Sequence, residues 1–248
     1  MSTAIAERDL PQELTTEQAV EAAYSAELAE VASKLRRGLP VLVEADKDLA
    51  PFLYRDVRAR LKADGLQCHY LDGRPRTQDA NALASGFVAV MLGQLRDAVR
   101  GAVERRVVVL PHLDLLTTGQ GGLTAEAREV IPLLYENPEL VWLGFKDPSF
   151  PLPRVIENLF PHRASLLGIP RDRLRQLVTQ REARKFGRTF NPWGLYKYVS
   201  GVNPARLRRI LSTLEGEDYP SEPERRDRHH GLRQTMRGGS DLEPRSRP

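Results

Sequence analysis

One turn of the chain has the setting of a phosphate-binding loop without the residues that such a loop needs. The apolar run 41–43 is followed by a turn and then by residues 54–63, whose apolar spacing is helical. A phosphate-binding loop has the spacing G-x-x-x-x-G-K-[ST], because bare backbone N–H groups and a lysine must surround the phosphates. Placed on Ala45, that spacing meets a different residue type at every diagnostic position: Ala45 and Ala50 for the glycines, Pro51 for the lysine and Phe52 for the hydroxyl residue.

Two carboxylates make the same turn unfavourable for phosphate. Asp46 and Asp48 place negative charge where a triphosphate would lie. Together with Asp114 they could bind a metal near the strand ends, but aspartate also caps helices and forms turns, and we favour that second interpretation. The sequence therefore predicts the setting of a nucleotide site without its chemistry, and no bound metal.

Composition limits the class of protein. Of the 248 residues, 41% are apolar and 28% are charged, as in ordinary globular proteins, and the formal net charge is only +4. That charge permits contact with nucleic acid without arguing strongly for it. Cys68 is the single cysteine, so no disulfide framework or cysteine-based zinc site can form within one chain. The polar N-terminus is unlike a secretory signal and no apolar run approaches about 18 residues, so we expect a soluble, cytoplasmic protein without a membrane span.

Strand-like and helix-like segments alternate up to about residue 170. The expected strands are continuously apolar, which is typical of a parallel sheet covered on both faces; they are residues 41–43, 67–71, 106–110, 139–145 and 164–169. The expected helices among them are residues 15–37, 52–63, 80–104 and 124–135, the last capped by Thr124. Beyond them only helices are expected, at 171–186, 192–200 and 204–214. Residues 215–248 are rich in Pro, Gly, Arg and acidic residues, which indicates a disordered tail or linker.

The order of these elements resembles that of the AAA+ ATPases over residues 27–214. The strand RVVVL is followed by PHLDLL at 111–116, where that family has its Walker B acidic pair. The strand ELVWLGF leads to a polar position, a short helix, a further strand and a proline before a charged helix. Residues 201–211, GVNPARLRRIL, are similar to the lid helix that carries the family's second sensor arginine. The resemblance implies a P-loop-NTPase-like parallel sheet flanked by helices, with a small C-terminal helical lid.

The positions to which this resemblance assigns catalysis carry other residues. Pro111 and His112 stand where Walker B has the Asp that holds magnesium and the Glu that orients water. Asp114 matches a further acidic residue of the family that does not bind the metal. The remaining positions are the first sensor at Lys146, the second sensor at Arg206, and Asn158 and Leu159 in place of the arginine finger. Because these groups are lost together, we do not expect this chain alone to hydrolyse ATP.

His112 and an arginine-rich segment are the other candidates for function. At a strand end His112 could be a base or a ligand, but the sequence pattern offers it no partner, and we interpret it as structural. A basic helix over 171–188 could contact nucleic-acid phosphates, although Asp172 and Glu182 offset its charge and a solvated lid helix is the favoured interpretation. Trp142 and Trp193 are expected to serve packing rather than base stacking. The basic patch comprises Arg171, Arg173, Arg175, Arg181, Arg184 and Lys185.

We therefore expect a degenerate, non-hydrolysing AAA+ module, a pseudo-ATPase, that assembles in an oligomer and docks protein partners. The expected partners are AAA+ subunits or a tandem, active AAA+ domain of a longer protein. The expected parts are a flexible lead at 1–14, an α/β core at 15–170, a helical lid at 171–214 and a disordered tail or linker at 215–248. Two alternatives stay open: a nucleic-acid-binding subunit resembling those of clamp loaders, and a divergent ATPase. ATP and Mg²⁺ are expected as cofactors only in the second alternative.

Overall fold

The computed structural model describes residues 4–74, 86–100, 106–199 and 201–237. The chain divides into two compact units: residues 26–166 form one, and residues 1–25 with 167–248 form the other. We call them the sheet unit and the helical unit. Helix α1 (Thr16–Arg36) contributes to both, and its helical geometry is interrupted at Tyr24 (φ −127°, ψ 20°), next to the division.

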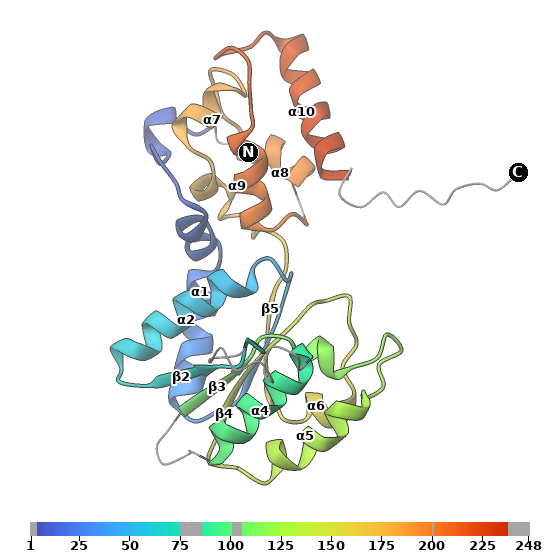
Figure 1. Ribbon diagram of the computed structural model, residues 1–248. Coiled ribbons are helices and arrows are strands. Elements are labelled where there is room, and N and C mark those ends of the chain that lie inside the picture. The colour runs from blue at the N-terminus through green and yellow to red at the C-terminus, as the bar shows by residue number, and fades with distance from the viewer. Residues whose placement is uncertain (1–3, 75–85, 101–105, 200, 238–248) are drawn as a thin grey trace, which may run out of the picture. The chain divides into compact units, whose positions relative to one another are not determined.

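Within the described ranges, the sheet unit contains one sheet of five strands, all paired in parallel (Figure 1). Its order is β2 (Gln67–Tyr70), β3 (Arg106–Leu110), β4 (Val141–Lys146), β1 (Val41–Ala45) and β5 (His162–Leu166). The inner strands β3, β4 and β1 are almost wholly buried, which explains their continuously apolar sequences. Because all strands run the same way, their carboxyl ends meet at one edge of the sheet.

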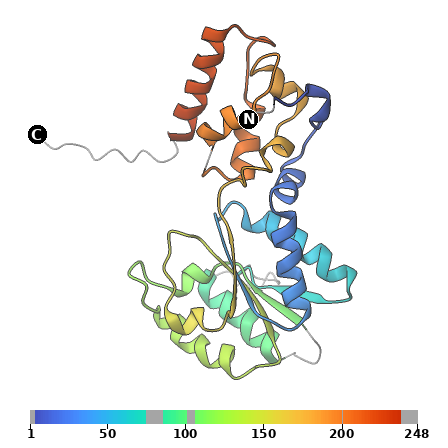
Figure 2. The ribbon, with the colours of Figure 1, turned by 180° about the vertical axis from the view of Figure 1, so that it is seen from behind.

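Helices cover both faces of this sheet (Figures 1 and 2). Helices α4 (Phe87–Arg100) and α5 (Ala125–Tyr135) pack on one face, where their apolar side chains share a core with β3 and β4. Helix α2 (Ala50–Ala63) and the sheet-unit part of α1 lie on the other face. The short helices η2 (Leu113–Leu116) and α6 (Arg154–Glu157) follow β3 and β4 in the chain. The predicted α/β class with a helix-covered parallel sheet is confirmed.

Short helices build the helical unit together with the first part of α1. They are η1 (Glu7–Asp9), η3 (Leu174–Leu177), α7 (Gln180–Arg184), α8 (Pro192–Val199), α9 (Pro204–Ser212) and α10 (Glu222–Arg237). A buried ion pair ties three of them together, because Arg208 Nη1 lies 2.6 Å from Glu182 Oε2 and 3.2 Å from the carbonyl oxygen of Leu177. The same carboxylate oxygen accepts the backbone N–H of Thr179 at 2.9 Å. The buried negative charge of Glu182 is therefore balanced by Arg208 and also hydrogen-bonded.

The single basic helix predicted over residues 171–186 is wrong. The chain forms η3, becomes extended at Val178 (φ −121°, ψ 127°), and starts α7 only after Thr179. Thr179 and Glu182 form a capping box, in which each side chain binds the other residue's backbone N–H. Two buried leucines hold η3 in the core, so local capping and burial override the helical spacing of the sequence.

Within the described residues, parts of the expected lead and of the expected tail are structured. In the expected lead, Leu10 is buried and the backbone of Ile5 donates a hydrogen bond to Phe190 at 3.1 Å. In the expected linker, α10 forms and packs against α8, with Leu232 buried and His229 stacked on Tyr198 at 4.9 Å between ring centroids. The sequence signal was weak because α10 is strongly charged and buries few side chains.

Three further predictions can be compared with the described residues. Helix α4 covers residues 87–100 of the predicted helix 80–104, and residues 80–85 and 101–104 lie outside the described ranges. Thr124 caps α5 as predicted, accepting the N–H of Ala127 at 3.2 Å. Among the described residues, no helix is long and apolar enough to cross a membrane.

Candidate functional site

The connection from β1 to α2 is a tight turn, at the place where the sequence has the setting of a phosphate-binding loop. Only residues 46–49 separate the strand from the helix, and the Leu49 N–H donates to the Asp46 carbonyl at 2.9 Å. Leu49 is fully buried, and Pro51 in the first turn of α2 has no N–H to offer. Ala45 and Ala50 are buried at the two ends of the turn. The predicted strand–turn–helix placement is therefore correct, and the turn is filled by its own residues.

A lysine in this turn contacts groups from two other strand ends. Lys47 Nζ forms an ion pair with Asp114 Oδ1 and lies 3.1 Å from His112 Nδ1, both of which follow β3. The backbone N–H of Lys47 donates to Asp147 Oδ2 at 3.3 Å, just after β4. We call Lys47, His112, Asp114 and Asp147 the sheet-edge cluster. Parallel strands bring it together, since the ends of β1, β3 and β4 share one edge.

The segment after β3 holds its part of the cluster through η2. His112 precedes η2 with a non-helical backbone, and Asp114 inside η2 is only 7% exposed. The Asp114 carbonyl accepts the Thr117 hydroxyl at 3.0 Å, which closes the short helix. Gly144 of β4 allows η2 to approach the sheet, because a Cβ there would overlap the Leu113 side chain and lie 2.8 Å from Phe160 Cζ. A bulkier residue in β4 would move His112 and Asp114.

The contact with Lys47 fixes the protonation of His112. A lysine ammonium can only donate, so His112 Nδ1 must accept and the neutral ring carries its proton on Nε2. Burial, and then the charge of Lys47, lower the pKa of His112 below its usual value. Burial raises the pKa of the Asp147 carboxyl, but hydrogen bonds from Ser149 and from the Lys47 backbone outweigh that effect and leave it below the usual range.

The segment after β2 forms the neighbouring wall. Gln94 of α4 accepts the Gly73 N–H at 3.1 Å and donates to the carbonyl of Arg74 at 2.8 Å. The Phe87 ring stands edge-on to His112, with 5.6 Å between ring centroids. Asp72 lies near enough to His112 to influence its titration. His112 thus lies in a half-buried environment of mixed polarity, and its structural role stays a prediction.

The other residues predicted for a nucleotide site are placed differently. Lys146, the predicted first sensor, ends β4 and pairs with Glu44 of β1 at 2.9 Å. Arg206, the predicted second sensor, lies in α9 of the helical unit, so its role stays a prediction. Pro111 ends the β3 segment beside His112, and Asp46 and Asp48 lie in the turn of Lys47. In the part of the chain that the structure describes, no group of three or more His, Cys, Asp or Glu side chains could hold a metal ion.

Sequence reasoning missed Lys47 because the phosphate-loop spacing assigns the lysine to the position of Pro51. The available signal was a lone lysine in a turn between a buried strand and a helix. Its partners are 65 and 67 positions away in the chain, so no local pattern connects them.

The residues of the predicted basic patch have different surroundings. Arg184 is bound by Glu7 at 2.6 Å, and Lys185 by Asp218 at 2.7 Å, so both charges are neutralised within the helical unit. Arg181 borders a cavity of about 390 Å³ beside Arg208. The three arginines nearest the start of the segment instead line one larger pocket with Trp193; they are Arg171, Arg173 and Arg175.

We compared the chain with protein-family models, curated sequences and solved structures. No protein-family model matches the chain, and no curated protein sequence does. A solved structure of PCH-2 from C. elegans matches with a TM-score of 0.51 at 6% sequence identity. The chain shares its α/β fold with that structure. The match covers 92% of this chain and 73% of the PCH-2 chain, and at this identity it concerns the fold alone.

Proposed function

We propose that this chain is a non-hydrolysing AAA+-type module whose former nucleotide site is closed by its own side chains, and that it acts by docking protein partners. The observation that carries this proposal is the engagement of Lys47. Its ammonium group is neutralised by Asp114, and its backbone N–H is bound by Asp147. A phosphate-binding turn needs a free lysine ammonium and free backbone N–H groups. In this turn the carboxylates of Asp114 and Asp147 occupy both kinds of donor, in the way that phosphate oxygens would.

The chemistry of hydrolysis also lacks its groups. Pro111 and His112 replace the acidic pair that would hold magnesium and orient water. His112 is a poor substitute for a general base, because its Nδ1 lone pair accepts from Lys47 while its Nε2 carries the proton. Neither ring nitrogen can therefore take a proton from water unless the contact with Lys47 is broken.

Electrostatics disfavours a triphosphate at this edge. Asp46 and Asp48 share the turn with Lys47, and Asp114 and Asp147 approach it from β3 and β4. Lys146, the cation at the end of β4, is already paired with Glu44. Bringing a polyanion to this position would oppose several carboxylates at short range.

Isothermal titration calorimetry of the whole chain with Mg²⁺-ATP, combined with a phosphate-release assay, tests the loss of nucleotide chemistry. We expect neither binding heat nor turnover for the natural sequence. Asp114→Asn is the informative variant, since it frees the Lys47 ammonium without removing it. Weak ATP binding that appears only in this variant would support internal closure of the site.

The second candidate function is that of a divergent ATPase, and the lysine in the turn, Lys47, favours it. The same titration tests this alternative. Magnesium-dependent ATP binding by the natural sequence, lost in Lys47→Met and accompanied by turnover, would establish that alternative and reject the proposal. Arg209→Ala is a matched control, because it removes an exposed cation from the helical unit.

Docking of protein partners is the positive half of the proposal. A scaffold of the AAA+ type can pack against similar scaffolds without using its own nucleotide site. The exposed Leu115 of η2 and Phe150 after β4, each 37% exposed, are apolar contacts available for packing. The test mixes this chain with the AAA+ ATPase encoded nearest to it and measures complex mass by light scattering. A complex that Leu115→Asp weakens supports docking, whereas separate masses at all concentrations contradict it.

A further inference from the structure

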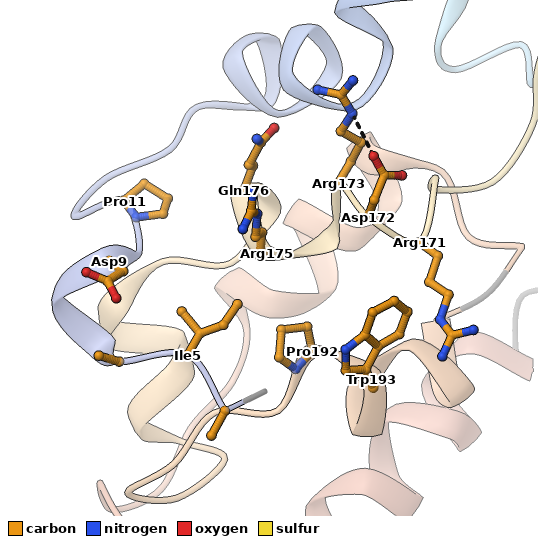
Figure 3. A pocket seen from close by; sticks show the side chains of 12 residues that line it. Ile5, Asp9, Pro11, Arg171, Asp172, Arg173, Arg175, Gln176, Pro192 and Trp193 are labelled. Carbon is orange, nitrogen blue, oxygen red and sulfur yellow. Dashed lines mark ion pairs between the residues drawn. The ribbon is translucent and has the colours of Figure 1, made fainter. Parts of the chain in front are cut away.

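A pocket of about 980 Å³ lies within the helical unit (Figure 3). The N-terminal segment supplies one wall with Ile5, Asp9 and Pro11, and the start of α8 supplies Pro192 and Trp193. The segment 171–176 lines the rest of the pocket with its arginines. The volume is at the upper end of the range for ligand sites.

Hydrogen bonds hold the walls of this pocket in place. The Ile5 N–H donates to Phe190 at 3.1 Å on one side, and Gln180 binds the carbonyl groups of Pro11 at 2.9 Å and Leu10 at 3.0 Å on the other. Trp193 is oriented by its backbone N–H, which donates to Asn191 Oδ1 at 3.0 Å. The segments that line the pocket are therefore held in place by hydrogen bonds.

The cationic part of the lining consists of three arginines that have different partners. The Arg171 guanidinium lies over the Trp193 ring, 3.6 Å from its centroid, and Figure 3 shows the two side chains together at one side of the pocket. Arg173 is paired with Asp172 at 3.3 Å. Within the described residues, neither Arg171 nor Arg175 forms an ion pair. The stack on Trp193 holds the Arg171 group flat and leaves its N–H edge available to an anion.

This combination fits one kind of ligand. A guanidinium stacked on an indole offers a flat outer face for a planar ring, and a second arginine that lines the same pocket can bind a phosphate. We propose that the pocket binds single-stranded nucleic acid, with a base stacked on the outer face of Arg171 and an adjacent backbone phosphate held by Arg175.

Duplexes and acidic peptides fit the pocket less well. In a duplex the bases are stacked on each other and cannot stack on Arg171. An acidic peptide could pair with the arginines, but it has no planar base to stack on the Arg171 guanidinium. The proposal gives Trp193 a role in stacking, where the sequence favoured packing alone. It also limits nucleic-acid contact to one half of the predicted basic patch. Asp9 on the facing wall restricts the number of phosphates that the pocket can take.

Fluorescence anisotropy with labelled oligo(dT) of about ten nucleotides tests the proposal on the whole chain at low salt. We expect Arg171→Ala to weaken binding about tenfold, as loss of one stacked base does elsewhere. Arg171→Lys keeps the charge but removes the planar face, so it should weaken binding nearly as much. Arg175→Ala should reduce the slope of log affinity against log salt by about 0.7, the value of one phosphate contact on a single strand.

Controls separate this site from general attraction of anions. Arg209→Ala removes an exposed charge of the same unit and should leave affinity unchanged, while Trp193 emission should be quenched by the oligonucleotide. Thermal melting shows whether each variant is folded. Absence of binding at low salt, or full affinity in Arg171→Lys, would overturn the proposal. Equal competition by poly-glutamate would assign the pocket to acidic peptides instead.

Discussion

Lys47 Nζ and His112 Nδ1 lie 3.1 Å apart, which joins the end of β1 to the end of β3 across the carboxyl edge of the sheet. The ion pair between Lys47 and Asp114 adds to this link. An open parallel sheet usually leaves its carboxyl edge to a ligand, and here the protein's own side chains meet there. We therefore expect these contacts of Lys47 to contribute to the stability of the fold and to its dependence on pH.

The two members of the Lys47–Asp114 pair should contribute unequally to stability. Asp114 is 7% exposed and would be left as a buried, unpaired carboxylate in Lys47→Met, whereas the Lys47 side chain is 36% exposed and can turn to water in Asp114→Asn. We expect Lys47→Met to lower the free energy of unfolding by about 2 kcal/mol, after allowance for solvent screening, and Asp114→Asn by about half as much. Urea denaturation followed by tryptophan fluorescence measures both. Equal losses would contradict the asymmetry.

Stability should fall on mild acidification, partly through His112. Its folded pKa lies below the ordinary value of 6.5 because of burial and Lys47. The neutral ring therefore contributes stability above about pH 6.5, and this contribution is lost as the pH falls toward the folded pKa. His229 has a lowered pKa for the same first reason, burial, and acts in the same direction.

The variant His112→Asn isolates the share of His112, since its amide oxygen can still accept from Lys47 but does not titrate near neutrality. We expect a shallower fall in unfolding free energy between about pH 7 and pH 5 than in the natural sequence. An unchanged slope in His112→Asn would show that His112 is not the titrating group.

Two glycines should respond to alanine with opposite signs. At Gly144 a Cβ would overlap Leu113 and come within 2.8 Å of Phe160, so Gly144→Ala should destabilise by about 1–3 kcal/mol. At Gly93, inside α4, a Cβ meets nothing within 4 Å, so Gly93→Ala should stabilise by about 0.5–1 kcal/mol. Thermal unfolding of the two variants provides the comparison. Destabilisation of both would mean that α4 packs more tightly than described.

Cys68 should react slowly with alkylating reagents. Burial raises the pKa of its thiol to about 11, from a usual value of 9.0, so the reactive thiolate is scarce. At a pH near 8 we expect alkylation by iodoacetamide to be about a hundredfold slower than for an unhindered cysteine, and to recover in urea. Because Cys68 is the single cysteine, mass spectrometry of the intact chain reports its modification directly. Rapid native reaction would indicate that β2 opens readily.

The sequence predicted those features that depend on neighbours along the chain. The strand RVVVL matches β3 at both ends, and Thr124 caps α5 as its position suggested. Continuous apolar runs separated by helices were sufficient for the parallel sheet, because only strands buried on both faces carry such runs. The failure at residues 171–186 has a local cause as well, since the capping box at Thr179 competes with the helical period.

What the sequence by itself determined is the α/β order of elements and the absence of phosphate-loop residues between β1 and α2. Only the tertiary structure decided what fills that edge and where the arginines lie. Lys47 and Asp114 are 67 positions apart, and parallel strand pairing brings them together. Arg171 meets Trp193 because α8 folds back beside the 171–176 segment. Local patterns reflect burial and backbone preference, whereas the choice of partner for a charge depends on side chains from distant segments that packing brings within a few ångströms.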